Sequence, residues 1–319
     1  MKWKFYSLAF VAGMSILTAC SSDDNNDNDG NGGNGNGNEI ENGTILKGTI
    51  TSDVTLAAGN TYKLSGEYIV EEGATLHIEE GVKIIAVYDD IADYILVKQG
   101  GKINAVGTPD KPIVMTSEKE EPGAWGGIHI CGRAHTNAEG GKGSSEIGGA
   151  VYGGNDDADN SGTLQYIRLE YTGFAFDEEH EANGISFYGV GNGTIVDHCQ
   201  AYKGSDDGFE FFGGSVNVSN LVAVSCSDDS FDWTEGWNGK GTNLVAYQEA
   251  ESTLGYDCDC LMECDNNGSN NAATPVAHPV LKNLILVGNG GSKQGIRLRA
   301  GTEVEIDNAL SLIHISEPT

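Results

Sequence analysis

Acidic side chains recur at a fixed spacing in the second half of the chain. Residues 205–211 read SDDGFEF, and residues 227–233 repeat the pattern as SDDSFDW after 22 positions. If the two segments occupy equivalent places on neighbouring strands, their carboxylates lie close together, because such strands are only ~4.8 Å apart. Carboxylates at that distance can hold a cation, exchange protons with a substrate, or keep a surface soluble. Which of these roles is possible depends on the strands and turns that carry the acidic residues, because they determine where the carboxylates lie.

The repeat extends beyond the acidic residues. The phrase NLVA at 220–223 returns at 243–246, and short alternating strands precede both acidic motifs. A period in the low twenties, built of short strands and turns rich in Gly, Asn and Asp, is typical of the coils of a β-solenoid. Sustained helical periodicity is missing from the sequence. The sequence therefore predicts an all-β fold, a single-stranded right-handed parallel β-helix over residues 44–310.

One strand can be followed through five successive predicted coils. Its first and third positions are apolar and are expected to face the interior, so the second and fourth face outward. The five segments are 185–188, 209–212, 231–234, 262–265 and 296–299, and their second positions form an outward column of Ser186, Glu210, Asp232, Glu263 and Arg297. The fourth position adds Asp265 and Arg299, and the turns before the strands add Asp206, Asp207, Asp228, Asp229 and Asp259.

Three interpretations of these acidic residues remain open. In the first, carboxylates hold Ca²⁺, which takes about six to eight oxygen ligands; the candidate ligands are Asp206, Asp207, Asp228, Asp229, Asp259 and Asp265. In the second, Glu210, Asp232 and Glu263 act on a polysaccharide, since glycoside hydrolases use carboxyl groups roughly 5–9 Å apart. In the third, the acids only keep a repetitive surface soluble, and Arg297 neutralises Glu263. Calcium is the only cofactor expected.

Aromatic side chains next to this column are candidates for glycan contact, because flat rings stack on sugar rings. Tyr188 and Phe212 occupy outward positions on the same predicted sheet, and Trp237 lies in a turn beyond it. The alternative is that each packs beneath a loop. Phe211 and Trp233 occupy inward positions and are expected in the core.

Four phrases in this order resemble a family of bacterial β-helix proteins related in architecture to pectate lyases. They are GTPDKPIVMTS, WGGIHICGRA, SDDGFEFFGG and DNNGSNNAATP, and the resemblance runs from about Leu46 to Leu310. It implies the fold and leaves the activity open, because one fold hosts many functions. On this architecture a calcium-assisted lyase can use an arginine as base, which makes Arg297 or Arg299 a further catalytic candidate by resemblance.

The first 19 residues predict export. Lys2 and Lys4 precede a short apolar stretch, and Leu17-Thr-Ala-Cys20 resembles the lipobox of bacterial lipoproteins, in which Cys20 is lipidated. Residues 20–43 are expected to form the lipidated cysteine and a disordered Asp/Asn/Gly linker. The acidic run after Cys20 resembles the surface-export signal of bacteroidete-type lipoproteins. We therefore expect a membrane anchor through the lipid on Cys20, at the outer membrane facing the exterior; a stalk facing the periplasm is the alternative.

Charge narrows the range of partners. With 47 acidic and 18 basic side chains the formal charge is −29, which disfavours a nucleic-acid partner. The acidic and aromatic groups expected on one elongated face make a polysaccharide the candidate partner. Beyond Cys20 there are six cysteines, whose pairing the sequence does not select, and Cys258, Cys260 and Cys264 lack the spacing of a zinc site. The oligomeric state is left open. Residues 311–319 do not fit a further coil, which predicts a truncated chain.

Overall fold

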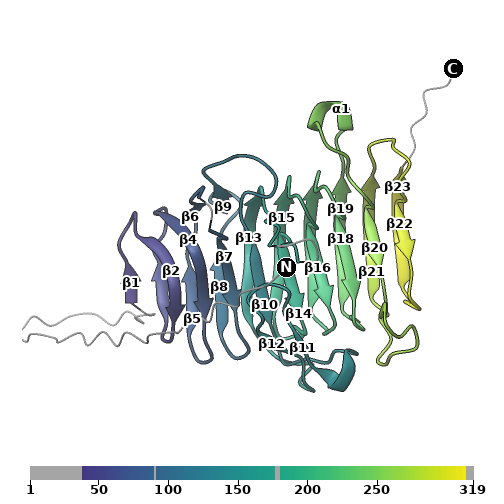
Figure 1. The fold of residues 1–319 in the computed structure, drawn as a ribbon, viewed down its shortest axis with the longest axis horizontal. Helices are drawn as coiled ribbons and strands as arrows, with labels where there is room; N and C mark the ends of the chain where they lie inside the picture. The colour runs from purple at the N-terminus through teal and green to yellow at the C-terminus, as the bar shows by residue number, and fades with distance from the viewer. Residues whose placement is uncertain (1–37, 90, 177–179, 314–319) are drawn as a thin grey trace, which may run out of the picture. The chain divides into compact units, whose positions relative to one another are not determined.

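The described part of the chain is a right-handed parallel β-helix, as the sequence predicts. The structure is a computed structural model and describes residues 38–89, 91–176 and 180–313. Within these residues the strands stack coil upon coil in chain order (Figure 1). The predicted signal peptide, Cys20 and residues 21–37 of the predicted linker lie outside the described residues. Regular pairing begins at Asn38 and extends to Leu312, somewhat beyond the expected limits of 44 and 310.

Successive coils pair through parallel ladders, and the one antiparallel pair among the described strands joins β11 to β12. The first coils contain β1 (Asn38–Ile40), β2 (Ile45–Ile50), β3 (Val54–Leu56), β4 (Thr61–Val70), β5 (Thr75–Ile78), β6 (Lys83–Ala86), β8 (Lys102–Val106) and β9 (Ile113–Ser117). A ladder of short strands contains β7 (Tyr94–Val97), β10 (Ile128–Cys131), β14 (Ile185–Tyr188), β16 (Phe209–Phe212), β18 (Phe231–Thr234), β20 (Met262–Cys264) and β22 (Ile296–Leu298). A ladder of long strands contains β13 (Gly162–Glu170), β15 (Ile195–Tyr202), β17 (Asn217–Val224), β19 (Lys240–Tyr247), β21 (Val280–Val287) and β23 (Glu305–Leu312).

Each long strand bends at one residue with a left-handed backbone. Asparagine tolerates this conformation better than most residues because its short polar side chain can hydrogen-bond locally. Asn220, Asn243, Asn283 and Asn308 hold φ between 54° and 62°. The side-chain amides of Asn243, Asn283 and Asn308 each donate to the side-chain oxygen of the preceding asparagine in the row, over 2.7–2.9 Å. The asparagine of the repeated phrase NLVA therefore marks the bend in β17 and in β19. His198 holds the same position one coil before Asn220, with φ 53°, as its alignment with that residue suggests.

The interior is filled by the inward residues of all coils. Aromatic rings stack from rung to rung, with centroid separations of 5.1 Å for Phe187 and Phe211 and 5.6 Å for Phe209 and Phe231. Each fully buried large side chain of this kind contributes ~1.5–3 kcal/mol through removal from water. The rows of rings hold the coils in register, which fixes the outward positions as well.

The chain leaves the coil between β10 and β13, and we call residues 132–161 the excursion. It contains the short 3-10 helix η1 (Glu139–Gly141), β11 (Gly143–Ser144) and β12 (Val151–Tyr152). Ile147, Ala150 and Tyr152 form a second hydrophobic cluster with outward residues of β7, β14 and β16, separate from the interior. The excursion thus covers part of the outer face of the short strands.

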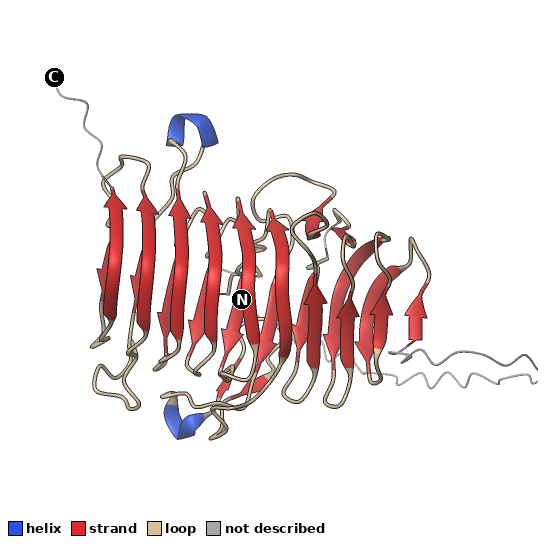
Figure 2. Cartoon of the chain, turned by 180° about the vertical axis from the view of Figure 1, so that it is seen from behind, coloured by secondary structure: helices blue, strands red, loops and turns tan. Residues whose placement is uncertain are grey.

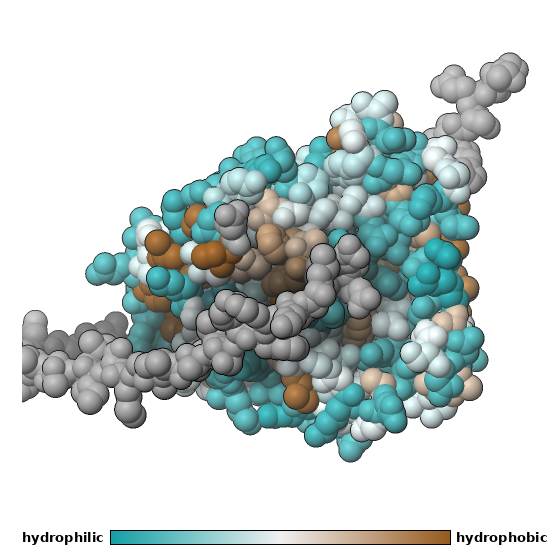
Figure 3. Space-filling view, viewed as in Figure 1, coloured by the Kyte–Doolittle hydropathy of each residue, from teal (hydrophilic) through white to brown (hydrophobic). Residues whose placement is uncertain are grey.

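Helical structure is minor. Besides η1, the described residues include one short α-helix, α1 (Glu251–Leu254), and both are drawn in blue in Figure 2. No helix in the described ranges has the length and apolar character needed to cross a membrane. The face shown in Figure 3 is mostly hydrophilic, with apolar colour confined to patches.

Candidate functional site

The acidic residues of the short strands form one outward column, as predicted. Ser186 pairs with Glu210, Glu210 with Asp232, Asp232 with Glu263, and Glu263 with Arg297, each on neighbouring strands. All five predicted rungs are therefore in the expected register, including the strand after the long insertion before β20. The column places three carboxylates on consecutive rungs.

A second column lies in the turns before these strands, and it is built around backbone hydrogen bonds. The side-chain oxygen of Asn183 accepts the N–H of Asp207 at 3.1 Å, and Oδ1 of Asp207 accepts the N–H of Asp229 at 2.9 Å. Oδ1 of Asp229 in turn accepts the N–H of Cys260 at 2.6 Å. Asp207 and Asp229 are 5% and 3% exposed. Each aspartate uses one carboxylate oxygen to accept a backbone N–H of the next coil, so its second oxygen remains for other interactions.

The two columns enclose a pocket of about 200 Å³ whose walls consist of carboxylates. Seven of its nine acidic side chains belong to the two columns, and two come from loops outside them. In the part of the chain that the structure describes, no basic side chain lines it. We call it the acidic pocket; its residues are Glu146, Glu181, Asp206, Asp207, Glu210, Asp228, Asp229, Asp232 and Glu263.

Oxygens in this pocket are close enough to share a cation. One group joins Asp207 with Glu210 and Asp232, and a second joins Asp207 with Asp206 and Asp228; within each group the ligand atoms lie within 4.8 Å of one another. Two oxygens bound to the same Ca²⁺ at ~2.4 Å are at most ~4.8 Å apart. Asp207 belongs to both groups, so the geometry suits two neighbouring cations that share this residue.

Burial and mutual repulsion shift the acidity of the pocket. Burial, reinforced by Asp228 and other acids, raises the pKa of Asp206 to about 7. Burial also raises the pKa of Asp229 to about 9 and those of Asp207, Glu210 and Asp232 well above their usual range. Oδ1 of Asp232 is buried and has no hydrogen-bond partner among the described residues. Without a cation, the pocket therefore holds protons at neutral pH.

Two arginines close one end of the acidic pocket. Arg297 contacts Glu263 at 2.7 Å, while Arg299 contacts Glu263 at 2.5 Å and Asp265 at 2.8 Å. Asp265 thus faces an arginine and does not line the pocket. Asp259 pairs with Lys293 at 2.9 Å and groups with Asp229 and the Cys260 thiol instead. Of the six predicted calcium ligands, Asp206, Asp207, Asp228 and Asp229 meet in the pocket.

Comparison with known families agrees with this architecture. The family model for a pectate-lyase-like beta helix domain matches residues 48–315. The chain belongs to this family. No curated protein matches the chain significantly.

The aromatic residues of this pectate-lyase-like beta helix do not form a glycan-binding surface, so that prediction is wrong. Tyr188 and Phe212 do point away from the interior, but the excursion covers them and leaves them 0% and 7% exposed. Trp237 is 1% exposed, stacks on Phe211 at 4.1 Å and donates to the carbonyl of Val216 at 3.2 Å. Its turn folds inward and closes the interior, which removes the ring from solvent.

Three residues of the site were not predicted from the sequence. Asn183 donates to Glu210 at 2.6 Å and holds the N–H of Asp207. The sequence could have predicted the position of Asn183, because Asn183-Gly-Ile aligns with Asp207-Gly-Phe one coil later. Glu146 and Glu181 come from loops between coils, where the repeat gives no register. Tyr188 donates to Glu146 at 3.3 Å, which links the covered aromatic cluster to the acidic pocket.

Proposed function

We propose that this protein binds divalent cations, Ca²⁺ foremost, in the acidic pocket of a β-helix that is carried on an exported lipoprotein. The observation that carries the proposal is the pair of three-carboxylate groups that share Asp207, all with oxygens within 4.8 Å. Hard oxygen ligands favour Ca²⁺ or Mg²⁺ over softer metals, and Ca²⁺ accepts crowded, irregular carboxylate cages better than Mg²⁺ does.

Proton release should accompany cation binding. The pocket carboxyls hold protons near neutral pH because burial raises their pKa values, and metal ligands must be deprotonated. Calcium affinity is therefore expected to rise with pH. Isothermal titration calorimetry in two buffers with different ionisation enthalpies measures the number of protons released. Equal heats in both buffers would contradict binding at this pocket.

The chain supplies its own test variant. Asn183 already performs the backbone-holding role of Asp207 one coil earlier, so Asp207→Asn keeps the acceptor for Asp229 and removes the shared charge. We expect this variant to fold and to lose most of its calcium affinity. Asp110→Asn, an exposed turn carboxylate far from the pocket in sequence, is the matched control.

Export and anchoring form part of the same proposal. The support is the lipobox-like sequence that ends at Cys20, followed by the acidic run at 21–38. Cys20→Ser should prevent incorporation of a labelled fatty acid in a bacterial host. Digestion of intact cells by an added protease distinguishes exposure at the cell exterior from a location in the periplasm.

Cleavage of a polysaccharide is the second candidate function, and one observation favours it. Burial raises the pKa values of Asp206 and Glu146 to about 7, which suits a general acid near neutral pH. The lyase form has less support, because the guanidinium groups of Arg297 and Arg299 are both engaged in ion pairs with Glu263. Release of reducing ends or unsaturated products from polysaccharides, compared between the native protein and Asp232→Asn, tests this candidate.

A further inference from the structure

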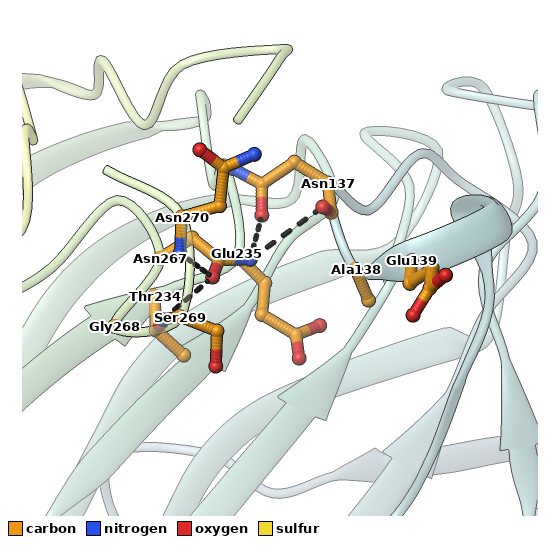
Figure 4. Close-up of a pocket in the computed structure, with 9 residues that line it drawn as sticks. All are labelled: Asn137, Ala138, Glu139, Thr234, Glu235, Asn267, Gly268, Ser269 and Asn270. Carbon is orange, nitrogen blue, oxygen red and sulfur yellow. Dashed lines mark hydrogen bonds between the residues drawn. The ribbon is translucent and has the colours of Figure 1, made fainter. Parts of the chain in front are cut away.

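A second and larger pocket lies at the opposite end of the short strands from the acidic pocket. Its volume is about 680 Å³, within the usual range for small-ligand sites. Three segments form it: residues 137–139 of the excursion, residues 234–235 at the end of β18, and residues 267–270. Figure 4 shows the Glu235 side chain between the turn at Asn267–Asn270 and the segment at Ala138–Glu139. We call it the amide pocket.

The wall of the amide pocket is held rigid by buried amides. Asn137 donates to the side chain of Asn266 at 2.8 Å and to the carbonyl of Pro275 at 3.0 Å. It also accepts from the side chain of Asn267 at 3.0 Å. Asn137 and Asn266 are 8% and 0% exposed, respectively. This network joins the excursion to a loop about 130 positions later, so the pocket is formed before any ligand arrives.

Several polar groups that line the pocket retain unused hydrogen-bonding capacity. Oε2 of Glu235 accepts from the hydroxyls of Thr136 and Tyr152, both at 2.7 Å, which orients the carboxylate and leaves Oε1. Within the described residues, the carboxylate of Glu139 and the hydroxyl of Ser269 have no hydrogen-bond partner. The side-chain nitrogen Nδ2 of Asn270 is also unpaired in this part of the chain, while its side-chain oxygen accepts from the N–H of Ala272 at 3.2 Å.

The kinds of groups in the amide pocket define its ligand. Two carboxylates accept hydrogen bonds, amides and hydroxyls donate and accept them, and none of the described residues that line the pocket is a lysine or arginine. An anionic ligand, including a uronate sugar, would be repelled. Among the described residues that line the pocket, Ala138 is the only one with a purely aliphatic side chain and none is aromatic, so large apolar side chains of a peptide would find few partners. A neutral sugar presents adjacent hydroxyls, which are donors for a carboxylate and partners for amides.

We propose that the amide pocket binds a neutral saccharide unit. This site is distinct from the cation site proposed for the acidic pocket, because the two pockets share no lining residue. Glu139 and Glu235 accept sugar hydroxyls, while Asn270 and Ser269 complete the hydrogen bonds from the opposite wall.

The test begins with the full chain on an array of neutral and uronate-containing glycans. Isothermal titration calorimetry with the neutral oligosaccharide that binds best, in the presence of EDTA, then gives its affinity. Glu139→Gln and Asn270→Asp change exposed side chains, and Asn270→Asp removes the donor but keeps the oxygen that accepts the N–H of Ala272, so both should leave the melting temperature unchanged. Each is expected to weaken binding about tenfold, as loss of a hydrogen bond to a charged or amide group predicts. Glu251→Gln in α1 is the matched control.

The outcomes separate this proposal from cation binding. Neutral-glycan binding that survives EDTA and Asp207→Asn but weakens in both amide-pocket variants supports the site. The absence of binding to any neutral glycan, a preference for uronates, or unchanged affinity in both variants overturns it. Binding that EDTA or Asp207→Asn abolishes also overturns it, because it assigns the sugar to the acidic pocket. Calcium titration without glycan reports on the proposed function separately.

Discussion

Oδ1 of Asp207 accepts the backbone N–H of Asp229 at 2.9 Å, so the residue that two carboxylate groups share is also the residue that fastens one coil to the next. The hydrogen bond to Asp229 uses Oδ1 and leaves Oδ2 for a cation. A cation at this position would therefore stabilise the stacking of coils directly, in addition to relieving the repulsion between buried acids.

Asp207→Asn should separate these two roles. The amide oxygen keeps the bond to Asp229, while the charge that burial disfavours is removed. In EDTA at alkaline pH, where the native protein has to ionise its buried carboxyls, the variant is expected to melt a few degrees higher than the native protein, since one buried like charge is gone. Calcium affinity is expected to fall at least tenfold. Differential scanning calorimetry with and without Ca²⁺ measures both effects, and a variant stabilised by Ca²⁺ as strongly as the native protein would contradict the assignment.

The stability of the cation-free protein should fall as pH rises. Burial places the folded-state pKa of Asp206 at about 7 and that of Asp229 at about 9, above the value of ~3.9 for an unfolded chain. A carboxyl whose pKa is higher in the folded state than in the unfolded state stabilises the fold fully at a pH below its unfolded-state pKa. This stabilisation is lost as the pH rises through the folded-state pKa. Urea denaturation in EDTA between about pH 4 and pH 9 should show this decline. Ca²⁺ should remove most of it at the alkaline end.

Asn183 should be essential for the shape of the acidic pocket. It is 1% exposed, donates to Glu210 at 2.6 Å and accepts from the N–H of Asp207. Asn183→Ala leaves these buried groups unpaired, and we expect a loss of about 2–4 kcal/mol in the free energy of unfolding. Chemical denaturation measures this loss. Asn289→Ala, which removes an exposed bond to Asp257, should change stability by less than about 1 kcal/mol.

The positive charge of Arg297, next to the acidic pocket, should weaken the binding of a cation in that pocket. Its guanidinium lies 2.7 Å from Glu263, which lines the pocket. Arg297→Gln removes one positive charge near the site, so calcium affinity should increase about threefold at low salt and less at high salt. Titration calorimetry at two ionic strengths tests this, with Lys47→Gln as a distant control. An affinity that decreases would indicate that Arg297 positions a ligand.

Trp237 should matter for folding and not for glycan contact. Its ring is buried against Phe211 and Trp233 in the interior. Trp237→Ala is expected to cost about 3–5 kcal/mol of stability, as deletion of a large core side chain does. Denaturation curves measure this cost, and glycan affinity measured on the folded fraction should stay unchanged. A Trp237→Ala variant that stays as stable as the native protein but loses glycan binding would contradict this and indicate that Trp237 contacts the glycan.

The regular part of the molecule was predictable because one residue type per position repeats with the coil. Alternation of inward and outward residues placed Glu210, Asp232 and Glu263 in one column, and the strand pairing confirms it. The irregular part was not predictable in this way. Whether Tyr188 faces solvent depends on the excursion, whose path no repeat specifies, and Glu146 enters the acidic pocket from the same segment.

The regular coil also determines how the acidic site can change in evolution. Since each coil supplies one rung and receives its backbone hydrogen bond at an equivalent position, duplication of the 22 residues at 205–226 would insert a complete rung without disturbing its neighbours. The inserted coil would bring two more aspartates and a glutamate into the row. A β-helix of this kind can therefore gain additional carboxylate ligands for cations by adding coils.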